Sequence, residues 1–217
     1  MTPDLFAGLP VTPERLDPAP GVVLFKARLT APAAALLAQV DEVLAQAPPR
    51  HMRTPGGQSM SVAMTNCGPL GWVTDRQGYR YAARDPEREQ PWPPMPEALR
   101  QAAVSAAAAA GFPGFAPDAC LINRYAPGAR MGLHQDRDEA DFSQPIVSFS
   151  FGLPALFLLG GLVRNERTQK LLLEHGDVLV WGGPARLRFH GVQAIQPGCH
   201  DLVGECRFNL TFRRAAP

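Results

Sequence analysis

Two histidines and one aspartate in the second half of the chain have the types and spacing of a metal-ligand set. His134 and Asp136 stand two positions apart, so both side chains leave the same face of an extended segment. His190 follows 54 residues after Asp136, a separation that a small two-sheet β-fold can close across its mouth. Two histidines and a carboxylate leave three coordination positions open, the arrangement of non-haem Fe(II) centres. The sequence therefore predicts a catalytic Fe(II) site with His134, Asp136 and His190 as ligands.

Zinc is the alternative metal for such ligands. A structural zinc site generally uses four protein ligands, and no cysteine lies near His134 or Asp136 in the sequence. Three ligands with open positions therefore favour iron. A second set of metal-ligating types, Cys199, His200 and Cys206, lacks a fourth member and regular spacing, so we expect no second metal site.

A second signal lies in residues 207–213, where polar and apolar side chains alternate as RFNLTFR. In a strand, this alternation gives one apolar face and one face that carries two arginines, Asn209 and Thr211. Two guanidinium groups inside a barrel require an anionic partner, and arginine binds carboxylates through paired hydrogen bonds. Arg207 and Arg213 are therefore predicted to hold the two ends of 2-oxoglutarate, whose 2-oxo acid end chelates iron, with neutral donors from residues 121–125. The predicted cosubstrate-binding residues are Asn123, Tyr125, Arg207, Asn209 and Arg213.

Short strands are expected to position these residues. The 217 residues include 20 Gly and 23 Pro, which argues against a helical bundle and for many turns. Helical spacing and alanine content predict helices over residues 31–47 and 97–111. Strands are predicted over residues 21–25, 119–125, 146–152, 155–159, 169–173, 177–181, 188–192 and 206–213. We therefore predict a β-rich α+β fold, a jelly roll or double-stranded β-helix with helices on one face.

The chain is expected to form one folded domain, because 46% of its residues are hydrophobic and its net charge is only +1. Residues 1–20 contain five prolines and are predicted to be an irregular N-terminal arm. Residues 21–217 are predicted to be the single domain, with a jelly-roll core over residues 115–214. Residues 48–96 are interpreted as a surface insertion with a hairpin through Met60–Met64 and Gly71–Tyr81.

The sequence favours a cytoplasmic monomer. Residues 1–10 lack the basic and apolar segments of a signal peptide, and the four cysteines include no CxxC pair. Residues 146–163 are uncharged and long enough to span a membrane. Pro154 and the Gly160-Gly161 pair divide that stretch into two strand-length pieces, so no membrane association is expected.

A basic, aromatic stretch covers residues 50–84. It contains five arginines against the single acid Asp75, a local net charge of +4, together with Trp72, Tyr79 and Tyr81. Basic groups interleaved with rings are typical of surfaces that bind single-stranded nucleic acid. The alternative is a solvated arginine-rich surface above core aromatic residues.

Several motifs together resemble the bacterial AlkB family of Fe(II) and 2-oxoglutarate-dependent DNA-repair dioxygenases. The motifs are NRYAPGA at 123–129, HQD at 134–136, HG at 190–191, RFNLTFR at 207–213, TPGG at 54–57, SVAMTNCG at 61–68, DACLI at 118–122, LLLEHGD at 171–177 and WGG at 181–183. The resemblance covers residues 21–213 and makes residues 48–96 a nucleotide-recognition insertion. It implies oxidative demethylation of bases such as 1-methyladenine and 3-methylcytosine, preferably in single-stranded DNA, with Fe(II), 2-oxoglutarate and O2. Double-stranded DNA and RNA stay open as substrates.

The resemblance also implies residues that contact the substrate. These methylated bases are cationic near neutral pH, so an aromatic face and a carboxylate favour them. Trp72 and Asp138 match the family's positions for those two groups, with His134 as the opposite stacking wall. The remaining substrate-binding positions are Thr54, Tyr79 and Arg164, which match contacts to the DNA backbone or neighbouring nucleotides, and Met64 in the pocket wall. Gln58 and Met131-Gly132 depart from the family pattern, which predicts altered affinity or strand preference.

Two other functions remain open at this point. A 2-oxoglutarate oxygenase that hydroxylates a protein or a small molecule would share the ligand set and the arginine strand. It would have no use for the basic aromatic insertion. A non-catalytic jelly-roll module of the cupin kind would have little reason to bury two arginines.

Overall fold

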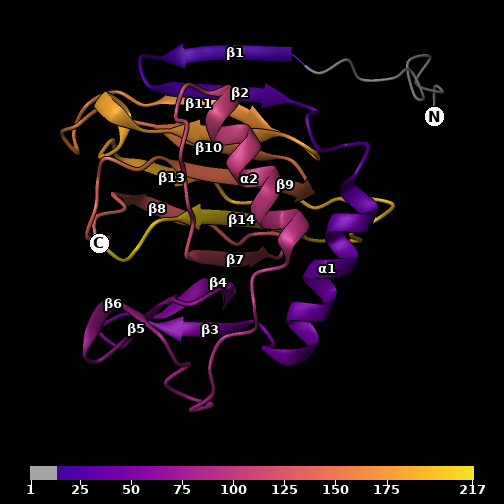
Figure 1. Cartoon of the computed structure of the whole chain (residues 1–217), viewed down its shortest axis with the longest axis vertical. Coiled ribbons are helices and arrows are strands. Elements are labelled where there is room, and N and C mark those ends of the chain that lie inside the picture. Colours follow the sequence, from indigo (N-terminus) through magenta and orange to yellow (C-terminus); the bar gives the residue numbers. More distant parts are fainter. Residues whose placement is uncertain (1–13) are drawn as a thin grey trace.

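An antiparallel sheet of eight strands is the largest element of the computed structural model, which describes residues 14–217 (Figure 1). Its strand order is β1-β2-β12-β9-β14-β7-β4-β3. The strands are β1 (Glu14–Ala19), β2 (Val22–Lys26), β3 (Arg50–Arg53), β4 (Ser59–Cys67), β7 (Ala119–Tyr125), β9 (Ile146–Gly152), β12 (Val178–Trp181) and β14 (Arg207–Arg213).

A smaller sheet of four strands, in the order β11-β10-β13-β8, packs against the large one. Its strands are β8 (Met131–His134), β10 (Ala155–Leu159), β11 (Gln169–Leu173) and β13 (His190–Val192). Apolar side chains from both sheets, including Leu24, Phe157 and Leu179, form one buried cluster between them. Burying an apolar face on each side explains why the two sheets stay together. This arrangement confirms the predicted jelly roll.

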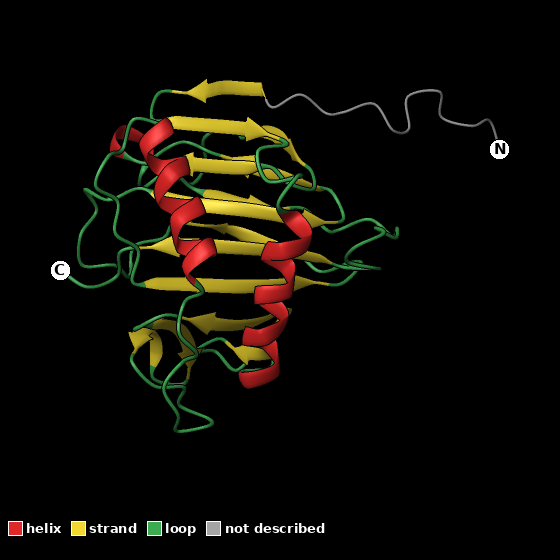
Figure 2. Ribbon diagram, turned by 45° about the vertical axis from the view of Figure 1, so that its right-hand side comes forward, coloured by secondary structure: helices red, strands yellow, loops and turns green. Residues whose placement is uncertain are grey.

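Two helices, α1 (Ala33–Gln46) and α2 (Glu97–Ala109), lie across one face of the large sheet (Figure 2). Their buried residues, such as Val40 and Leu99, share a core cluster with Phe208, Leu210 and Phe212 of β14. The apolar face of β14 therefore points toward the helices, and its polar face points toward the small sheet. The predicted cover of helices on one face and the predicted alternation along β14 are both confirmed.

The prediction of an irregular arm is wrong for residues 14–19, which form β1; residues 1–13 lie outside the described part of the chain. β1 pairs with β2 at the edge of the large sheet, with Leu16 opposite Leu24. Pro18 lies where the pairing is irregular, between Leu16 and Ala19. An edge strand tolerates proline at such a point because no ladder hydrogen bond is lost there.

The predicted hairpin through Met60–Met64 and Gly71–Tyr81 is wrong, because these two segments do not pair with each other. β5 (Gly71–Asp75) and β6 (Gly78–Ala82) form a separate two-stranded sheet, whereas β4 pairs with β3 and β7 in the large sheet. Val62 and Met64 of β4 are fully buried. Burial of this apolar run makes β4 part of the core, so the insertion is not wholly on the surface.

The strand predicted over residues 188–192 begins only at His190, so residues 188 and 189 are not part of it. A short 3-10 helix, η1 (Gly183–Ala185), precedes it, and the Arg188 N–H still bonds the Ala185 carbonyl. Extended pairing therefore starts only at His190. The uncharged stretch 146–163 forms β9 and β10, as predicted, and no helix within residues 14–217 is long and apolar enough to cross a membrane.

Candidate active site

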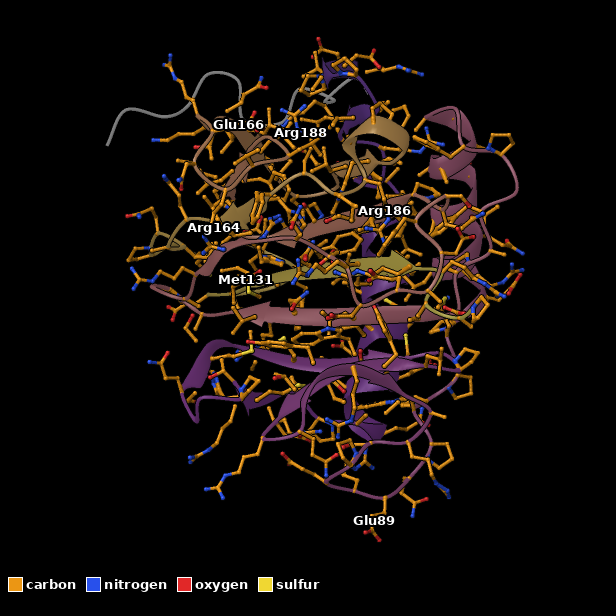
Figure 3. The ribbon with its side chains drawn as sticks, turned by 90° about the vertical axis from the view of Figure 1, so that its left-hand side faces the viewer. Glu89, Met131, Arg164, Glu166, Arg186 and Arg188 are labelled. Carbon is orange, nitrogen blue, oxygen red and sulfur yellow. The ribbon has the colours of Figure 1, made fainter. Side chains whose placement is uncertain are left out.

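A cavity of about 650 Å³ opens between the polar face of β14, the small sheet and the β5–β6 hairpin. Met131 and Arg164, which both line it, are labelled in Figure 3. The cavity collects nearly all of the residues singled out from the sequence. Those that line it are Met64, Trp72, Tyr79, Asn123, Tyr125, His134, Asp136, Asp138, Arg164, His190, Arg207, Asn209 and Arg213.

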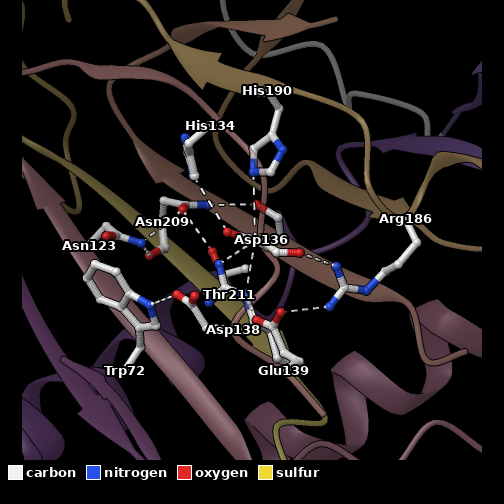
Figure 4. A network of polar contacts seen from close by, with 12 residues as sticks. Trp72, Asn123, His134, Asp136, Asp138, Glu139, Arg186, His190, Asn209 and Thr211 are labelled. Atoms are coloured by element: carbon white, nitrogen blue, oxygen red, sulfur yellow. Dashed lines mark hydrogen bonds and ion pairs between the residues drawn. The ribbon is translucent and has the colours of Figure 1, made fainter. Parts of the chain in front are cut away.

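The two histidines meet because β8 and β13 are paired with His134 opposite His190. One potential ligand atom from each of His134, Asp136 and His190 lies within 4.8 Å of the others. The His134 Nε2 and His190 Nε2 atoms lie 3.6 and 3.7 Å from carboxylate oxygens of Asp136 (Figure 4). A Cβ at Gly191 would lie 2.8 Å from the Met131 carbonyl oxygen, so glycine permits this close strand approach. The predicted ligand set is assembled.

Backbone contacts fix how the two imidazoles present their nitrogens. His134 Nδ1 lies 2.9 Å from the Gly132 carbonyl oxygen, and His190 Nδ1 lies 3.0 Å from that of Arg188. A carbonyl only accepts hydrogen bonds, so each Nδ1 must carry the proton. Both Nε2 lone pairs are then free and directed toward Asp136, as ligation to a metal requires.

Electrostatics keeps these groups in their ligating forms. Burial, followed by the nearby His134, lowers the pKa of His190 to about 4, so its imidazole is neutral at pH 7. Burial alone would raise the pKa of Asp136, but the positive charge of Arg213 and the imidazoles hold it well below its usual range. Two imidazole nitrogens and a carboxylate suit a divalent iron, so the residues present fit the implied metal.

Arg213 is paired by protein carboxylates. Its Nη2 donates to Asp136 Oδ2 at 2.6 Å, and its Nε lies 3.3 Å from Glu139 Oε1. Burial opposes the charge of Arg213, but Asp136 outweighs it and raises the pKa of the guanidinium. The sequence analysis assigned Arg213 to 2-oxoglutarate alone and did not recognise Asp136 and Glu139 as its protein partners.

Arg207 differs from Arg213 because no carboxylate within residues 14–217 pairs with it. Its side chain is 1% exposed and donates to Ser150 Oγ at 2.8 Å and to the Leu153 carbonyl at 3.3 Å. Its Nε finds no partner among the described residues, and burial lowers the pKa of the guanidinium to about 10. A buried cation with an unused donor, facing a cavity, fits one carboxylate of 2-oxoglutarate.

Strand register brings the neutral donors beside the two arginines. Tyr125 of β7 pairs with Arg207, and Asn123 pairs with Asn209. Asn123 Oδ1 is buried without a partner in the described chain, so it has unused hydrogen-bonding capacity. Burial raises the pKa of Tyr125 to about 12, which keeps its hydroxyl protonated and able to donate. These residues add neutral polar groups to the part of the cavity that Arg207 and Arg213 line.

An aromatic pair closes the other end of the cavity. The Trp72 and Tyr79 rings stack with centroids 5.7 Å apart and planes 20° apart. Trp72 Nε1 donates to Asp138 Oδ2 at 2.8 Å (Figure 4). A ring face and a carboxylate therefore lie together in the cavity that His134 also lines, the combination expected to favour a cationic base.

Thr54 is the one predicted site residue that does not line the cavity. It lies in the turn between β3 and β4, where its Oγ1 accepts the Gln58 N–H at 3.2 Å. Conversely, sequence reasoning missed Tyr81, Glu139 and Arg186 as parts of a polar network behind the cavity. The Asp138-Glu139 pair directly after the ligand motif was the available signal for Glu139.

The basic insertion carries fewer free charges than its sequence suggests. Arg50 pairs with Asp85 at 2.6 Å, just beyond the stretch counted, and Arg80 pairs with Asp75 at 2.7 Å. Among the described residues, the arginines of this stretch without an ion pair are Arg53, Arg76 and Arg84, all exposed. We call these three the unpaired arginines of the insertion.

Comparisons with known proteins agree with this geometry. The family model described as the 2OG-Fe(II) oxygenase superfamily matches residues 21–213. The chain is 54% identical to the alpha-ketoglutarate-dependent dioxygenase AlkB of Escherichia coli over 98% of this chain and 97% of that protein. It is 38% identical to the nucleic acid dioxygenase ALKBH1 of Mus musculus over 63% of this chain and 34% of that protein. The solved structure of OsALKBH1 superposes with a TM-score of 0.78 at 30% identity, covering 93% of this chain and all of that one.

Proposed function

The chain belongs to the AlkB family within the 2OG-Fe(II) oxygenase superfamily, and on this premise we propose that it removes methyl groups from 1-methyladenine and 3-methylcytosine in single-stranded DNA. It is a dioxygenase that uses Fe(II), 2-oxoglutarate and O2 and oxidatively demethylates alkylated bases of nucleic acids. Neither alternative, hydroxylation of a protein or metal binding without turnover, finds support among these relatives.

The chain's own residues prepare the reaction in separate parts of the cavity. His134, Asp136 and His190 would hold the iron through two imidazole nitrogens and one carboxylate oxygen. Arg207 would bind one carboxylate of 2-oxoglutarate, and Arg213, anchored on Asp136, would bind near the other end. Bound iron and 2-oxoglutarate supply the oxidation: one oxygen atom of O2 enters succinate as carbon dioxide leaves, and the other converts the N-methyl group to formaldehyde.

The observation that carries the choice of substrate is the contact between Trp72 and Asp138 in the cavity that His134 also lines. A methylated base that is cationic gains from stacking on the indole and from the nearby carboxylate. An unmodified neutral base gains only the stacking. The Trp72 Nε1 donor occupies Asp138 Oδ2, so the other carboxylate oxygen is the one available to a base.

Single-stranded DNA is the proposed form of the substrate. A base inside a duplex cannot reach a cavity between two sheets, so it must be unstacked first, at a cost of a few kcal/mol. The exposed Tyr79 and the unpaired arginines of the insertion provide a ring and positive charges for a flexible strand. Binding of one strand therefore needs no unpairing energy.

The proposed substrate is tested with one lesion in several settings. The same 3-methylcytosine is presented in single-stranded DNA, in a duplex, in RNA and as the free nucleoside, and formaldehyde release is measured at limiting concentrations. We expect the highest kcat/KM for single-stranded DNA. A higher value for RNA or for the duplex would overturn the choice of strand, and equal values for oligonucleotide and nucleoside would remove any role of the insertion.

We also propose that the enzyme works as a monomer in the cytoplasm. Cys67, Cys120 and Cys206 are buried free thiols and Cys199 is an exposed one, which suits a reducing compartment. Sedimentation at micromolar concentration, with and without an oligonucleotide, tests whether the protein is a monomer.

A further inference from the structure

Two consecutive acids after the ligand motif hold the β5–β6 hairpin against the rest of the protein. Trp72 and Tyr81 are cross-strand partners in this hairpin. Trp72 Nε1 donates to Asp138 Oδ2 at 2.8 Å, and the Tyr81 hydroxyl donates to Glu139 Oε1 at 2.6 Å. The hairpin is thus attached at two neighbouring points, both close in sequence to the ligand Asp136.

The two attachment points differ in their surroundings. Asp138 lines the cavity, where the proposed substrate enters, whereas Glu139 does not line it and its side chain is 2% exposed. Glu139 lies behind the cavity wall with Arg186 at 3.0 Å (Figure 4). Its carboxylate is therefore not available to a base, and the Tyr81 contact can persist when a base occupies the cavity.

Glu139 also contacts the arginine at the cosubstrate end. Arg213 Nε lies 3.3 Å from Glu139 Oε1, the oxygen that accepts the Tyr81 hydroxyl, and Arg213 Nη2 donates to Asp136. One oxygen atom thus joins the hairpin to a guanidinium that is bonded to a metal ligand. The charges of Asp136 and Glu139 balance those of Arg186 and Arg213, which makes this buried cluster sustainable.

We propose that Tyr81 and Glu139 are positioning residues that couple docking of the β5–β6 hairpin to binding of 2-oxoglutarate at Arg213. The inference rests on the proposed role of Arg213 toward the cosubstrate. When the Tyr81 hydroxyl donates to Glu139 Oε1, it holds this oxygen in the position from which it contacts Arg213 Nε. Without the Tyr81 hydroxyl, the Glu139 carboxylate loses one of its hydrogen-bond donors. Because coupling is reciprocal, cosubstrate binding must stabilise the docked hairpin by the same factor by which docking improves cosubstrate binding.

Hydrogen exchange of the hairpin amides measures this coupling without turnover. The full-length protein is loaded with Mn(II), and exchange over residues 71–82 is followed with and without 2-oxoglutarate. In the wild type, the cosubstrate should slow exchange about tenfold, the effect of one hydrogen bond to a charged group. In Tyr81→Phe, basal exchange should be faster and the slowing by 2-oxoglutarate should be lost.

Two further variants separate coupling from general damage. Thr74→Val removes another hydroxyl of the same hairpin, which bonds the Arg53 carbonyl at 3.2 Å and not Glu139, so it should keep the wild-type response. Glu139→Gln keeps an acceptor for Tyr81 but loses the charge that holds Arg213. It should lose the response to 2-oxoglutarate.

Steady-state kinetics provides the second readout. Tyr81→Phe should raise the KM for 2-oxoglutarate about tenfold, with kcat at saturating cosubstrate within about twofold of the wild type. Equal protection of the hairpin by 2-oxoglutarate in Tyr81→Phe and wild type would overturn the coupling. If Thr74→Val lost the protection by 2-oxoglutarate to the same extent as Tyr81→Phe, the effect would be a general one on the hairpin, and the coupling would also be overturned.

Demethylation by the same wild-type preparation separates this inference from the proposed function. If the wild type demethylates and 2-oxoglutarate does not protect its hairpin, the coupling is wrong and the function stands. If protection depends on Tyr81 but methylated DNA is not turned over, the coupling stands and the proposed substrate is wrong.

Discussion

Arg207 and Arg213 share one face of β14, yet the structure predicts a large loss of stability when Arg213 is replaced by methionine and only a small change when Arg207 is. Arg213 is bonded to Asp136 and faces Glu139, whereas Arg207 has no carboxylate partner among the described residues. The perturbation is Arg207→Met in one protein and Arg213→Met in the other. Both are studied first without metal or 2-oxoglutarate.

The magnitudes follow from burial and pairing. Burial lowers the pKa of Arg207 from 12.5 to about 10, so folding disfavours its charged form by about 3 kcal/mol at every pH below 10. Methionine removes that penalty and loses the bonds to Ser150 and Leu153, at about 1 kcal/mol each. The free energy of unfolding of Arg207→Met should therefore differ from that of the wild type by no more than about 1–2 kcal/mol. Arg213→Met removes the arginine partner of the buried Asp136 and one of the two arginine partners of Glu139, and it costs about 3–5 kcal/mol.

Thermal unfolding in the presence of a chelator is the assay. For a chain of this size 1 kcal/mol corresponds to about 2–4 °C, so Arg213→Met should lower Tm by about 6 °C or more and Arg207→Met by clearly less. With Mn(II) and 2-oxoglutarate at 100 times its Kd, the wild type should gain about 2.7 kcal/mol. Arg207→Met should lose most of that gain, because removing a buried charge partner weakens binding by at least about 30-fold.

The reasoning is refuted if Arg207→Met is destabilised as much as Arg213→Met before ligand is added. That result would mean that Arg207 is satisfied within the protein and needs no ligand. A full shift of Tm by 2-oxoglutarate in Arg207→Met would remove this residue from the cosubstrate site.

Three further predictions concern acid stability, salt and stacking. Burial, followed by the nearby His200, lowers the pKa of His175 from 6.5 to about 4, so stability present above pH 6.5 is lost as pH falls toward 4, on the order of 1 kcal/mol after solvent screening. The Tm of His175→Gln should therefore depend less on pH between 6.5 and 4 than the Tm of the wild type. An unchanged dependence would contradict this role of His175. Replacing any one of the unpaired arginines of the insertion by alanine should reduce the slope of the logarithm of the binding constant for single-stranded DNA against the logarithm of the salt concentration by about 0.7. Arg50→Ala should leave this slope unchanged, because Arg50 is paired with Asp85. Equal effects of the two kinds of variant would mean that ion pairing inside the protein does not matter. Trp72→Ala should raise the KM for a methylated oligonucleotide about tenfold or more, since stacking contributes about 1–3 kcal/mol per base. The KM for 2-oxoglutarate should stay constant. Parallel changes in both KM values would argue against a stacking role of Trp72.

Local patterns predicted the parts of the site that depend on strand geometry. The period of two along residues 207–213 placed Arg207 and Arg213 on one face, and the structure shows that face toward the cavity. The spacing of His134 and Asp136 likewise predicted two ligands on one side of the chain, and strand pairing brings His190 to them. Such patterns are visible because strand periodicity fixes side-chain direction within one segment.

Contacts between distant segments could not be predicted in the same way. Tyr81 and Glu139 are 58 positions apart, and Arg50 and Asp85 are 35 apart, with no periodic signal that links the members of either pair. A count of charges over residues 50–84 therefore overestimated the free charge, and Glu139 was not considered as a partner of Arg213. Pro18 similarly hid β1, because proline argues against a strand unless the strand lies at an edge.

The most direct test of the account is the mass of a single-stranded oligonucleotide that contains one 3-methylcytosine, incubated with Fe(II), 2-oxoglutarate and O2. We predict that the oligonucleotide loses the mass of one methylene group, that formaldehyde and succinate form in equal amounts, and that His134→Ala abolishes all three. Succinate formation by the wild type with an intact oligonucleotide would contradict the proposed substrate. Loss of the methyl group without any need for 2-oxoglutarate would contradict the assignment of the cavity.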